Sequence, residues 1–574
     1  MEKAKLWVYN TMSKQKELFE AKEAGKVGMY VCGVTAYDLS HIGHARAYVA
    51  FDLLYRYLVH LGYEVKYVRN FTDVDDKIIR RANELGEDPL ELSNRFCQEF
   101  LNDMDDLQCC RPTHQPRVSE HMDQIRDMIM QVRLKVRCTH LSWECLSEGF
   151  ERDSMGHDMA RRLTVPHRML ELSVLLTIGF SWQIIKNECA YPVDGDVYFS
   201  VDKFPAYGQL SGRKLEDNRA GERIAIDSRK RNPADFALWK AVKPGEPSWD
   251  SPWGPGRPGW HIECSAMSAH YLSPSFDIHG GGMDLIFPHH ENEYAQSGAA
   301  CSECNITYWM HNGFVTENNE KMSKSLGNFF TIRDITSRYD PLALRYFLMS
   351  THYRSPVNYS ISQLEIASDS IYYIYQTLYD CEEGLNLLKD RFLKEESNPK
   401  AEKITSEAQD CIKKMRSDFQ IKMSDDLHTP EILNGTLQET FRLMNKSLES
   451  LKKKKQQQRA LFHSLVAIER EVTDILDVLG LMSSTYSELA CPTEKVLQQL
   501  KGKALKRAEV TEDDILQKIE ERTQARRDKR YDKSDQIRLE LKAKGIALMD
   551  LGAETIWRPC VPAEQEQPIA PPST

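Results

Sequence analysis

The amino-acid sequence predicts an α/β protein built on a doubly wound parallel sheet, followed by a helical domain and a small mixed α/β domain. Between Val27 and Ile79 a strand, a turn, a helix and a second strand follow one another, which is a βαβ unit. The alternation of strand and helix returns after Gly259, and helical periodicity dominates beyond Pro356. We therefore expect a sheet whose strands come from two separated stretches of the chain.

Length and composition exclude several classes of protein. The chain has 574 residues, of which 41% are hydrophobic and 28% are charged, as in a globular protein of several domains. No stretch reaches the roughly 20 apolar residues that a bilayer crossing needs, so we expect no membrane contact. The fourteen cysteines form no dense framework, and the N-terminal sequence shows neither a signal core nor an Arg-rich transit segment, which favours the cytosol.

The sequence pattern divides the chain into three expected parts and a tail. Residues 1–355 carry the sheet, interrupted by an inserted module of hairpins at about 108–258. Residues 356–490 form a helical domain, residues 500–560 a small C-terminal domain, and residues 561–574 a Pro-rich tail without fixed structure. The net charge of −10 leaves open whether nucleic acid is a partner, and the sequence leaves monomer and homodimer open.

The first βαβ unit places two short polar stretches beside each other. The strand around Met29 ends at Cys32, and the second strand ends near Asn70. Ligands of such sheets bind beyond the carboxyl ends of the strands. The stretches 32–44 and 70–77 are therefore expected to border one ligand site.

Two short motifs carry groups suited to a polyphosphate. His41 and His44 lie one helical turn apart at the start of a helix, beside its unpaired backbone N–H groups. Lys321 and Lys324 have the same spacing in a Ser- and Gly-rich loop, where their ammonium groups could reach phosphate oxygens. Taken singly, the histidines could merely cap the helix and the lysines could belong to a solvated loop. The two motifs together, in this order and about 280 residues apart, indicate a polyphosphate site far more specifically than either alone.

These motifs identify a resemblance to the class I aminoacyl-tRNA synthetases, whose HIGH and KMSKS signatures match residues 41–44 and 321–325. Within that family the sequence is similar to the cysteinyl-tRNA synthetases. The stretches that carry the similarity are YVCGVTAYD at 30–38, NFTDVDDK at 70–77, GWHIECSAM at 259–267 and FPHHENE at 287–293. The resemblance implies a Rossmann-like catalytic domain, Mg-ATP and L-cysteine as substrates, and tRNA(Cys) as partner.

The same stretches suggest a metal site. His289 and Glu293 are four residues apart on an expected helix, and the thiols of Cys32 and Cys264 could complete a set of four ligands. Thiolates with imidazole favour zinc over magnesium. The spacing alone does not establish the set, and His290 competes with His289. The resemblance implies one zinc ion at Cys32, Cys264, His289 and Glu293.

The resemblance also implies further substrate contacts. Thr72 and Trp260 match positions that enclose the amino acid, although a strand-end hydroxyl and a core indole explain them equally well. Gly33 belongs to the same motif as Cys32, and Asp284 follows a glycine run that the resemblance places near the adenosine. His41, His44, Lys321 and Lys324 are then the catalytic residues.

The C-terminal part carries a basic segment that could follow RNA phosphates. Residues 501–544 hold fourteen Lys and Arg against ten Asp and Glu. The resemblance implies an anticodon-binding domain here, in which Trp557 could stack on a base. A solvated charged helix is the alternative. The expected tRNA contacts are Arg522, Arg526, Arg527, Lys529, Arg530 and Trp557.

The expected activity is therefore ATP-dependent formation of cysteinyl-adenylate and transfer of cysteine to the 3′ end of tRNA(Cys). A cysteine ligase with an amino-sugar acceptor would need no anticodon domain, and a catalytically dead tRNA-binding relative would not need intact signatures. Residues 132–183 interrupt the resemblance and have no sustained helical or strand period. We interpret them as an insertion without a catalytic role, with a functional lid as the alternative.

Overall fold

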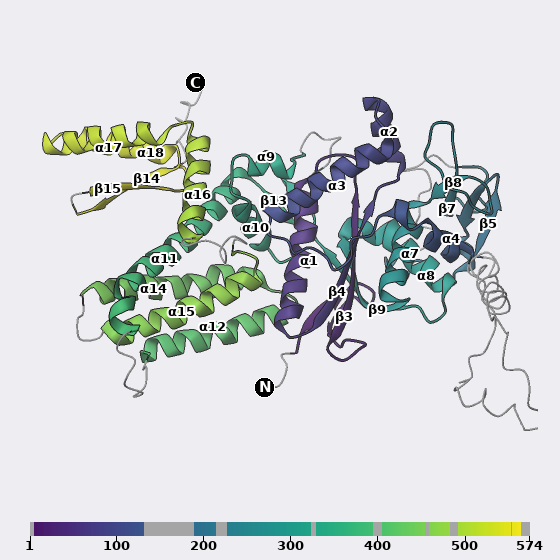
Figure 1. Cartoon of the computed structure of the whole chain (residues 1–574), viewed down its shortest axis with the longest axis horizontal. Helices are drawn as coiled ribbons and strands as arrows, with labels where there is room; N and C mark the ends of the chain where they lie inside the picture. Colours follow the sequence, from purple (N-terminus) through teal and green to yellow (C-terminus); the bar gives the residue numbers. More distant parts are fainter. Residues whose placement is uncertain are drawn as a thin grey trace, which may run out of the picture.

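The computed structural model describes residues 5–130, 189–213, 227–318, 320–322, 329–393, 404–453, 458–482, 492–552 and 554–563. Figure 1 shows the central sheet between an inserted module on one side and the helical and C-terminal parts on the other. The expected insertion at 132–183, Lys324 and residues 564–574 lie outside the described residues. In the described part, no helix is both long enough and apolar enough to span a bilayer.

The central sheet has four parallel strands in the order β10-β9-β3-β4. Helix α1 (Ile42–His60) connects β3 (Lys26–Thr35) to β4 (Glu64–Thr72), which confirms the expected βαβ unit. The chain returns on the other side of β3 with β9 (Ser275–Gly282) and then β10 (Asn305–Asn312). The order of strands thus reverses between β3 and β9, where ligands of open α/β sheets bind.

Alternate residues of β3 face two different cores, because successive side chains of a strand point to opposite faces. Met29 and Val31 belong to the core that contains α1. Tyr30 and Cys32 belong to the core on the opposite face, against α7 (Trp260–Leu272). This alternation directs the Cys32 side chain toward α7 and away from α1.

The inserted module is a four-stranded antiparallel sheet whose last strand leads directly into α7. Its strand order is β5-β6-β7-β8, and it confirms the hairpins expected between residues 190 and 240. Among the described residues between β4 and α7, the helices and strands are α2 (Asp76–Leu85), α3 (Pro89–Asp106), η1 (Val118–Glu120), α4 (Met122–Met130), β5 (Ala190–Val193), β6 (Asp196–Phe199), η3 (Val201–Lys203), β7 (Phe236–Ala241) and β8 (Gly256–Pro258).

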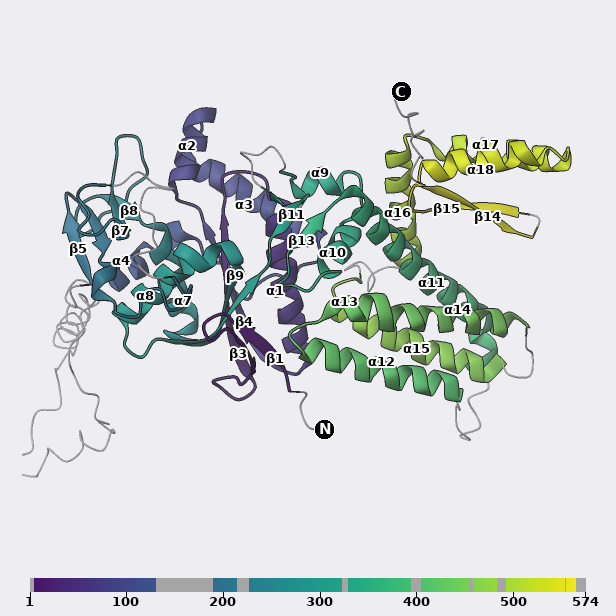
Figure 2. The ribbon, with the colours of Figure 1, turned by 180° about the vertical axis from the view of Figure 1, so that it is seen from behind.

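The remaining elements of the first part surround the sheet. They are the hairpin β1 (Trp7–Asn10) and β2 (Gln15–Leu18), η5 (Met283–Leu285), η6 (Ile286–His290), α8 (Glu291–Ala300), β11 (Val315–Glu317), β12 (Glu320–Lys321), α9 (Ile332–Thr336), α10 (Pro341–Met349) and β13 (Val357–Tyr359). Strand β11 pairs with β12 and β13 in a second, smaller sheet. Figure 2 shows this small sheet from behind, beside α9 and α10.

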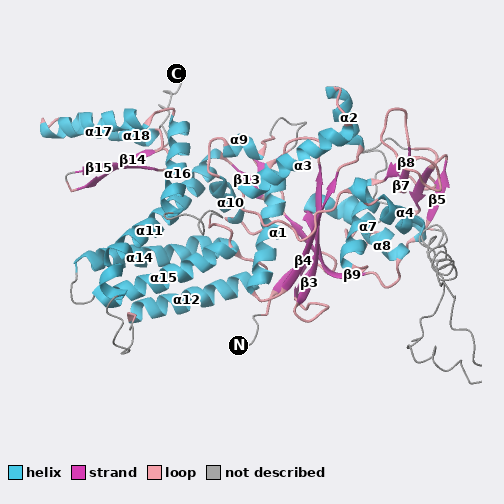
Figure 3. Ribbon diagram, in the orientation of Figure 1, coloured by secondary structure: helices cyan, strands magenta, loops and turns pink. Residues whose placement is uncertain are grey.

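The second half of the chain is mainly helical, as expected beyond Pro356 (Figure 3). Its first elements are α11 (Ile361–Leu393), α12 (Ser406–Ser424), α13 (Thr429–Glu431), η8 (Ile432–Thr436), α14 (Leu437–Lys453) and α15 (Gln458–Val478). The last are α16 (Pro492–Ala508), α17 (Glu512–Arg527), α18 (Tyr531–Ala543) and the hairpin β14 (Ile546–Leu551) and β15 (Glu554–Pro559). The end of α16, α17, α18 and the hairpin share a core of their own.

Two buried arginines hold α1 against the rest of the molecule. The Arg46 guanidinium donates to the backbone carbonyls of Leu348, in the last turn of α10, and of His352, just after that helix. The Arg345 guanidinium binds the Asp52 carboxylate of α1 at 2.5 Å, and neither side chain is more than 2% exposed. Removing one partner of such a buried pair leaves an uncompensated charge and costs about 3–5 kcal/mol. The helix that begins at the HIGH motif is therefore firmly positioned.

Candidate active site and metal centre

The structure brings the four expected metal ligands together at the carboxyl end of β3. The sulphur atoms of Cys32 and Cys264, a ring nitrogen of His289 and a carboxylate oxygen of Glu293 all lie within 4.8 Å of one another. They come from β3, α7, η6 and α8, and none of the four residues is more than 4% exposed. Glu293 Oε1 lies 3.0 Å from His289 Nε2 and accepts the Cys32 thiol proton at 3.3 Å.

The local chain geometry explains how His289 and Glu293 meet. The turn Ile286–His290 is kinked at Phe287, whose backbone is extended (φ −137°, ψ 130°), and α8 begins directly after it at Glu291. The turn and the helix together keep the spacing of four residues, so both side chains face Cys32. Cys264 lies in the second turn of α7, on the face that packs against β3.

The charges of these groups are strongly coupled. Burial would raise the pKa of Glu293, but His279 and His289 hold it well below its usual range. Burial alone would lower the pKa of His289, yet Glu293 and Cys264 raise it to about 10. Burial would raise the pKa of the Cys264 thiol, but a hydrogen bond with Cys32 and the charge of His289 lower it to about 6. Burial raises the pKa of the Cys32 thiol well above its usual value. The site therefore holds a Cys264 thiolate and a Glu293 carboxylate beside a protonated His289, whose positive charge a divalent cation at this place would replace.

The donor set of two thiols, one imidazole and one carboxylate fits zinc. Zinc prefers sulphur and nitrogen ligands in a tetrahedral arrangement, whereas magnesium prefers oxygen ligands alone. The Nδ1 atoms of His289 and His261 lie 2.9 Å apart. Because the raised pKa of His289 keeps its ring protonated, while burial lowers the pKa of His261 well below its usual value, His289 Nδ1 donates and His261 Nδ1 accepts. This bond leaves Nε2 of His289 to the metal, as metal-binding histidines commonly require.

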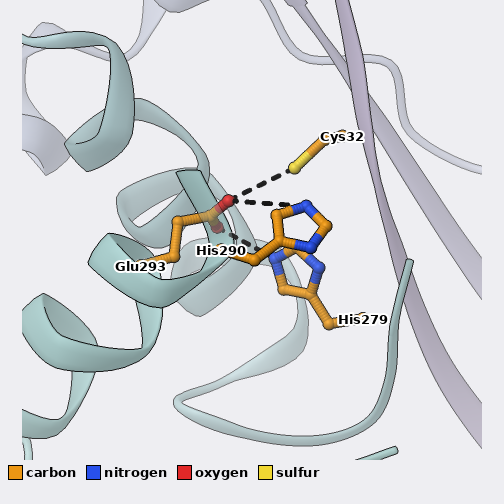
Figure 4. Close-up of side chains that lie close together, drawn as sticks. All are labelled: Cys32, His279, His290 and Glu293. Carbon is orange, nitrogen blue, oxygen red and sulfur yellow. Dashed lines mark hydrogen bonds and ion pairs between the residues drawn. The ribbon is translucent and has the colours of Figure 1, made fainter. Parts of the chain in front are cut away.

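A second group of four possible ligands overlaps the first, as Figure 4 shows. It consists of Cys32, His279, His290 and Glu293. His279 Nε2 binds Glu293 Oε2 at 2.9 Å, whereas His290 Nε2 lies 4.0 Å from Glu293 Oε1. His290 is also bound through Nδ1 to His311 at 2.7 Å. Only the first group contains both thiols, so it suits zinc better.

Sequence reasoning did not identify His261, His279 and His311 as part of this cluster. His279 lies near the carboxyl end of β9 and His311 near that of β10. Their positions at strand ends were the available signal, because strand ends of a parallel sheet converge on one edge. The sequence did not show that β9 and β10 follow β3 in the sheet, so it did not show that these histidines lie near Cys32.

Three of the expected substrate contacts border the cluster. The indole of Trp260 stacks on the His289 ring, with the ring centroids 4.1 Å apart. The hydroxyl of Thr72, at the end of β4, donates to the buried Glu263 carboxylate at 2.8 Å. The N–H of Gly33 donates to Asn70 Oδ1 at 2.8 Å.

Gly33 lies in a tightly packed position, whereas Asp284 is exposed. A Cβ atom at position 33 would lie 1.5 Å from the backbone oxygen of Asn70, so only glycine fits between β3 and β4 at this point. Asp284 lies in η5 and is exposed, outside the buried cluster of ligands.

The two histidines of the HIGH motif cap the N-terminus of α1. Capping was the alternative to phosphate binding in the sequence analysis. The His41 ring accepts the Gly43 N–H at 3.0 Å, and the His44 ring accepts the His41 N–H at 3.4 Å. The two rings stack with centroids 3.7 Å apart. Capping orients both imidazoles at the N-terminus of α1, where the helix dipole favours an anion.

The chain on either side of the KMSKS loop is held in place, and one side lies against the HIGH motif. Lys321 belongs to β12, which pairs with β11. After the loop, Thr331 forms a β-bridge with His41, and the Phe329 ring contacts the His41 ring with centroids 5.0 Å apart. Lys324 lies between these anchors, outside the described residues.

Burial corrects two of the expected tRNA contacts. The Arg522 side chain is 3% exposed and binds both carboxylate oxygens of Asp550, at 2.8 and 2.9 Å. Trp557 is 5% exposed and donates to Glu512 at 3.2 Å. Both stabilise the core of the C-terminal domain, so neither faces RNA in this arrangement. Arg526, Arg527, Lys529 and Arg530 are exposed.

Comparison with known proteins gives a consistent result. Residues 18–140 and 141–369 match the family model described as tRNA synthetases class I (C) catalytic domain. The chain is 56% identical over 564 residues to the chloroplastic/mitochondrial cysteine–tRNA ligase of Arabidopsis thaliana, covering 98% of this chain and 88% of that protein.

A second relative matches over nearly its whole length. It is the cytoplasmic cysteine–tRNA ligase 2 of Arabidopsis thaliana, 55% identical over 565 residues, with 98% of this chain and 99% of that protein covered. Among solved structures, the methionyl-tRNA synthetase of Mycobacterium tuberculosis has a TM-score of 0.52 at 13% identity, covering 81% of this chain and 92% of that one, which shows a shared Rossmann-like fold. The chain belongs to the cysteine–tRNA ligase family of the class I aminoacyl-tRNA synthetases.

Proposed function

We propose that this chain forms cysteinyl-adenylate from L-cysteine and Mg-ATP, and transfers the cysteine to the 3′ end of tRNA(Cys). The observation that carries this proposal is the buried two-thiol cluster at the point where the strand order reverses, within reach of Trp260 and Thr72. Cys32, Cys264, His289 and Glu293 would hold zinc, which when bound supplies a soft Lewis acid for the substrate thiol.

The proposed metal explains selection without a separate editing step. Serine has nearly the shape of cysteine, and a hydrophobic pocket separates such near-isosteres by only about 1–3 kcal/mol. A soft metal binds a thiolate directly, and coordination deprotonates a thiol readily. A metal held by the four buried ligands would therefore select a soft, acidic side chain. The thiol of cysteine has both properties, and the hydroxyl of serine has neither.

The experiment that tests this function is ATP–pyrophosphate exchange with the purified full chain. We expect exchange that depends on cysteine and is at least about 10³-fold slower with serine at equal concentration, because serine lacks the thiol that the site selects. Exchange that is equally fast with both amino acids would contradict the proposed role of the cluster.

In the proposed reaction, the cysteine carboxylate attacks the α-phosphorus of ATP as the bond to pyrophosphate breaks. Trp260 and Thr72 orient the amino acid, while Gly33 and Asp284 contribute to the walls for the substrates. His41 and His44 bind phosphate oxygens at the N-terminus of α1, and Lys321 and Lys324 neutralise the charge that develops on the leaving pyrophosphate. No side-chain nucleophile is required.

The proposed tRNA-binding surface includes the exposed side chains Arg526, Arg527, Lys529 and Arg530 at the end of α17 and the start of the following turn. Removing residues 510–574 is expected to leave pyrophosphate exchange unchanged and to weaken tRNA charging at least about tenfold, since phosphate contacts are lost. Both rates are measured on the same preparation. Removing only residues 564–574, which follow β15, is the matched control and should leave charging unchanged. Normal charging after the larger truncation would refute the proposed role.

Residues 132–183 are proposed to be an insertion without a catalytic role. The two matches to the family model meet at residues 140 and 141, inside this segment. Deleting residues 132–183 should preserve or improve solubility and exchange activity, because loop closure costs depend only weakly on length. A longer deletion that also removes α4 is the contrasting control, since Ile125 and Ile129 of α4 are fully buried and their loss should unfold the module. A folded 132–183 deletion that cannot activate cysteine would show that the segment belongs to the enzyme.

The alternatives are disfavoured by specific features. An amino-sugar ligase would not need the C-terminal domain formed by α17, α18, β14 and β15, and a dead tRNA-binding relative would not need the four clustered ligands.

We propose a cytosolic location, supported by the free thiols among the described cysteines, as in a reducing compartment. Because relatives include cytoplasmic and chloroplastic/mitochondrial proteins, organelle fractionation with an antibody to the native chain tests the location.

A further inference from the structure

Helix α16 joins the C-terminal domain to the rest of the chain. Val496, Leu497 and Leu500 in its first half belong to the core that contains α1. Ala504 and Ala508 in its second half belong to the separate core of α17, α18 and the hairpin. Figure 1 shows these last elements projecting from α16, away from the central sheet. The orientation of the C-terminal domain therefore depends on how the second half of α16 is held.

Arg507 attaches this half of α16 to α11 and to the segment between α9 and α10. Its Nε lies 3.2 Å from the Glu365 carboxylate of α11, and the two side chains are only 9% and 8% exposed. Its Nη1 donates to the Arg338 carbonyl at 3.0 Å, and its guanidinium lies over the Tyr339 ring, 4.6 Å from the centroid. The Tyr339 hydroxyl donates to the same Glu365 oxygen at 2.7 Å. A planar guanidinium bonded at its edge and stacked on its face is held in one orientation.

Two further contacts of the C-terminal part reach the same region. Lys503 of α16 donates to the carbonyl of Thr336, the last residue of α9. Arg558 of β15 lies 3.9 Å from Asp369 of α11, which is too far for a hydrogen bond, and both side chains are about one-third exposed. So exposed an ion pair contributes little, whereas breaking a buried pair is costly. Of these two ion pairs, the one formed by Arg507 therefore matters more for the position of the domain.

The same contacts set Arg507 apart from the residues proposed to bind tRNA. Arg527 on α17 is exposed, as a side chain that binds phosphate must be. Arg507 belongs to the same basic segment, residues 501–544, but its charge is paired within the protein. It therefore adds to the count of basic residues without offering its charge to RNA.

We propose that Arg507 is a positioning residue for the transfer of cysteine to tRNA. This inference rests on the proposed function. By holding α16 against Glu365 and Tyr339, Arg507 fixes the orientation of the C-terminal domain, and with it the orientation of a tRNA bound there. The tRNA reaches from this domain to the adenylate site, so a small rotation at α16 is enlarged at its 3′ end. A misplacement of about 1 Å at the reacting atoms can slow a reaction about 10²-fold.

The test compares Arg507→Ala with the wild-type full chain in three measurements. Pyrophosphate exchange should change by less than about twofold, because α9 is also held through Arg333, which binds Asp103 of α3 at 2.8 Å. Single-turnover transfer of cysteine from the bound adenylate to tRNA(Cys) should slow about 10- to 100-fold. The salt dependence of tRNA binding should stay the same, because no phosphate contact is lost. Arg416→Ala removes an exposed ion pair with Glu471 in the helical domain and should change none of the three.

Arg507→Lys keeps the test valid if Arg507→Ala folds poorly. Lysine retains the positive charge beside Glu365, but it loses the planar group that stacks on Tyr339 and bonds at two edges. It should slow the transfer at least about threefold and leave exchange unchanged. Arg527→Ala is the contrasting variant. It should weaken tRNA binding and reduce the salt slope by about one, as the loss of a phosphate contact does.

The outcomes separate this inference from the proposed function. If the wild-type chain exchanges pyrophosphate but does not charge tRNA(Cys), the proposed transfer itself is wrong. If the wild-type chain charges tRNA(Cys) and both Arg507 variants transfer at the wild-type rate, the positioning role is wrong. Equal losses of exchange and transfer, or a reduced salt slope in Arg507→Ala, would also overturn it, since the first indicates a general structural role and the second a direct RNA contact.

Discussion

Cys264→Ala is expected to abolish metal binding and cysteine activation together. The substitution removes one of two soft ligands from a site with four, and it leaves the charged Glu293 carboxylate and the Cys32 sulphur without the cation that compensates them. Thiolate ligands contribute strongly to zinc affinity, and the remaining three side chains form a weaker, unsatisfied site. We expect less than about a tenth of the wild-type zinc content and a loss of exchange of at least about 10³-fold.

The measurement combines zinc analysis with cysteine-dependent pyrophosphate exchange on one preparation. Cys381→Ala is the matched control. Cys381 is also buried, but it lies on α11, which contributes no residue to the ligand cluster. The control should retain zinc and exchange, with at most a modest loss of thermal stability from the small cavity. A Cys264→Ala variant with full zinc and normal discrimination against serine would show that the ligand set is wrong.

Lys324→Ala is expected to slow adenylate formation far more than it weakens cysteine binding. A lysine charge directed at the phosphates acts mainly where negative charge develops, so its loss lowers kcat more than it changes the KM for cysteine. We expect kcat for exchange to fall about 10²- to 10³-fold, in the range for losing one charge-stabilising donor. The flanking chain supports this placement, since Thr331 is bridged to His41 just after the loop.

Steady-state exchange with varied cysteine and ATP separates the two effects. Lys452→Ala is the control, because Lys452 belongs to a basic run at the end of α14 and should change neither constant. If Lys324→Ala raises the KM for ATP without lowering kcat, Lys324 is a contact to bound ATP only. In that event its proposed part in stabilising the transition state would be incorrect.

The sequence predicted the central βαβ unit because each of its features is local. An apolar strand, a helical repeat and an alternating strand can be recognised within short windows, and β3, α1 and β4 confirm all three. The same holds for His289 and Glu293, whose spacing of four residues brings them to one side of the chain. Local patterns of this kind do not depend on knowing the order of strands.

The rest of the site depends on contacts between distant parts of the chain. Cys32 and Cys264 meet because β3 packs against α7. Their spacing in the sequence made them candidates but did not establish the pairing, which the family resemblance implied. His279 joins them because β9 lies directly beside β3. No window of sequence contains that neighbourhood, which is why this histidine was missed.

The C-terminal domain shows a different limit of sequence patterns. Counting charged residues identified a basic segment but did not distinguish Arg522 from Arg527, which belong to the same helix. The structure separates them, because Arg522 faces Asp550 across the domain core whereas Arg527 is exposed. Trp557 was considered for base stacking because it is aromatic, yet its cross-strand partner Leu548 and the core of the domain bury it.

We propose that the substrate sulphur binds the metal held by Cys32, Cys264, His289 and Glu293. X-ray absorption at the zinc edge, measured on the zinc-loaded chain alone, with cysteine and with serine, counts the sulphur ligands of that metal. Two thiolate ligands should be present without substrate, a third sulphur should appear at about 2.3 Å with cysteine, and serine should leave the count at two. A sulphur count that does not change when cysteine binds and exchange proceeds would show that the substrate thiol does not bind the metal.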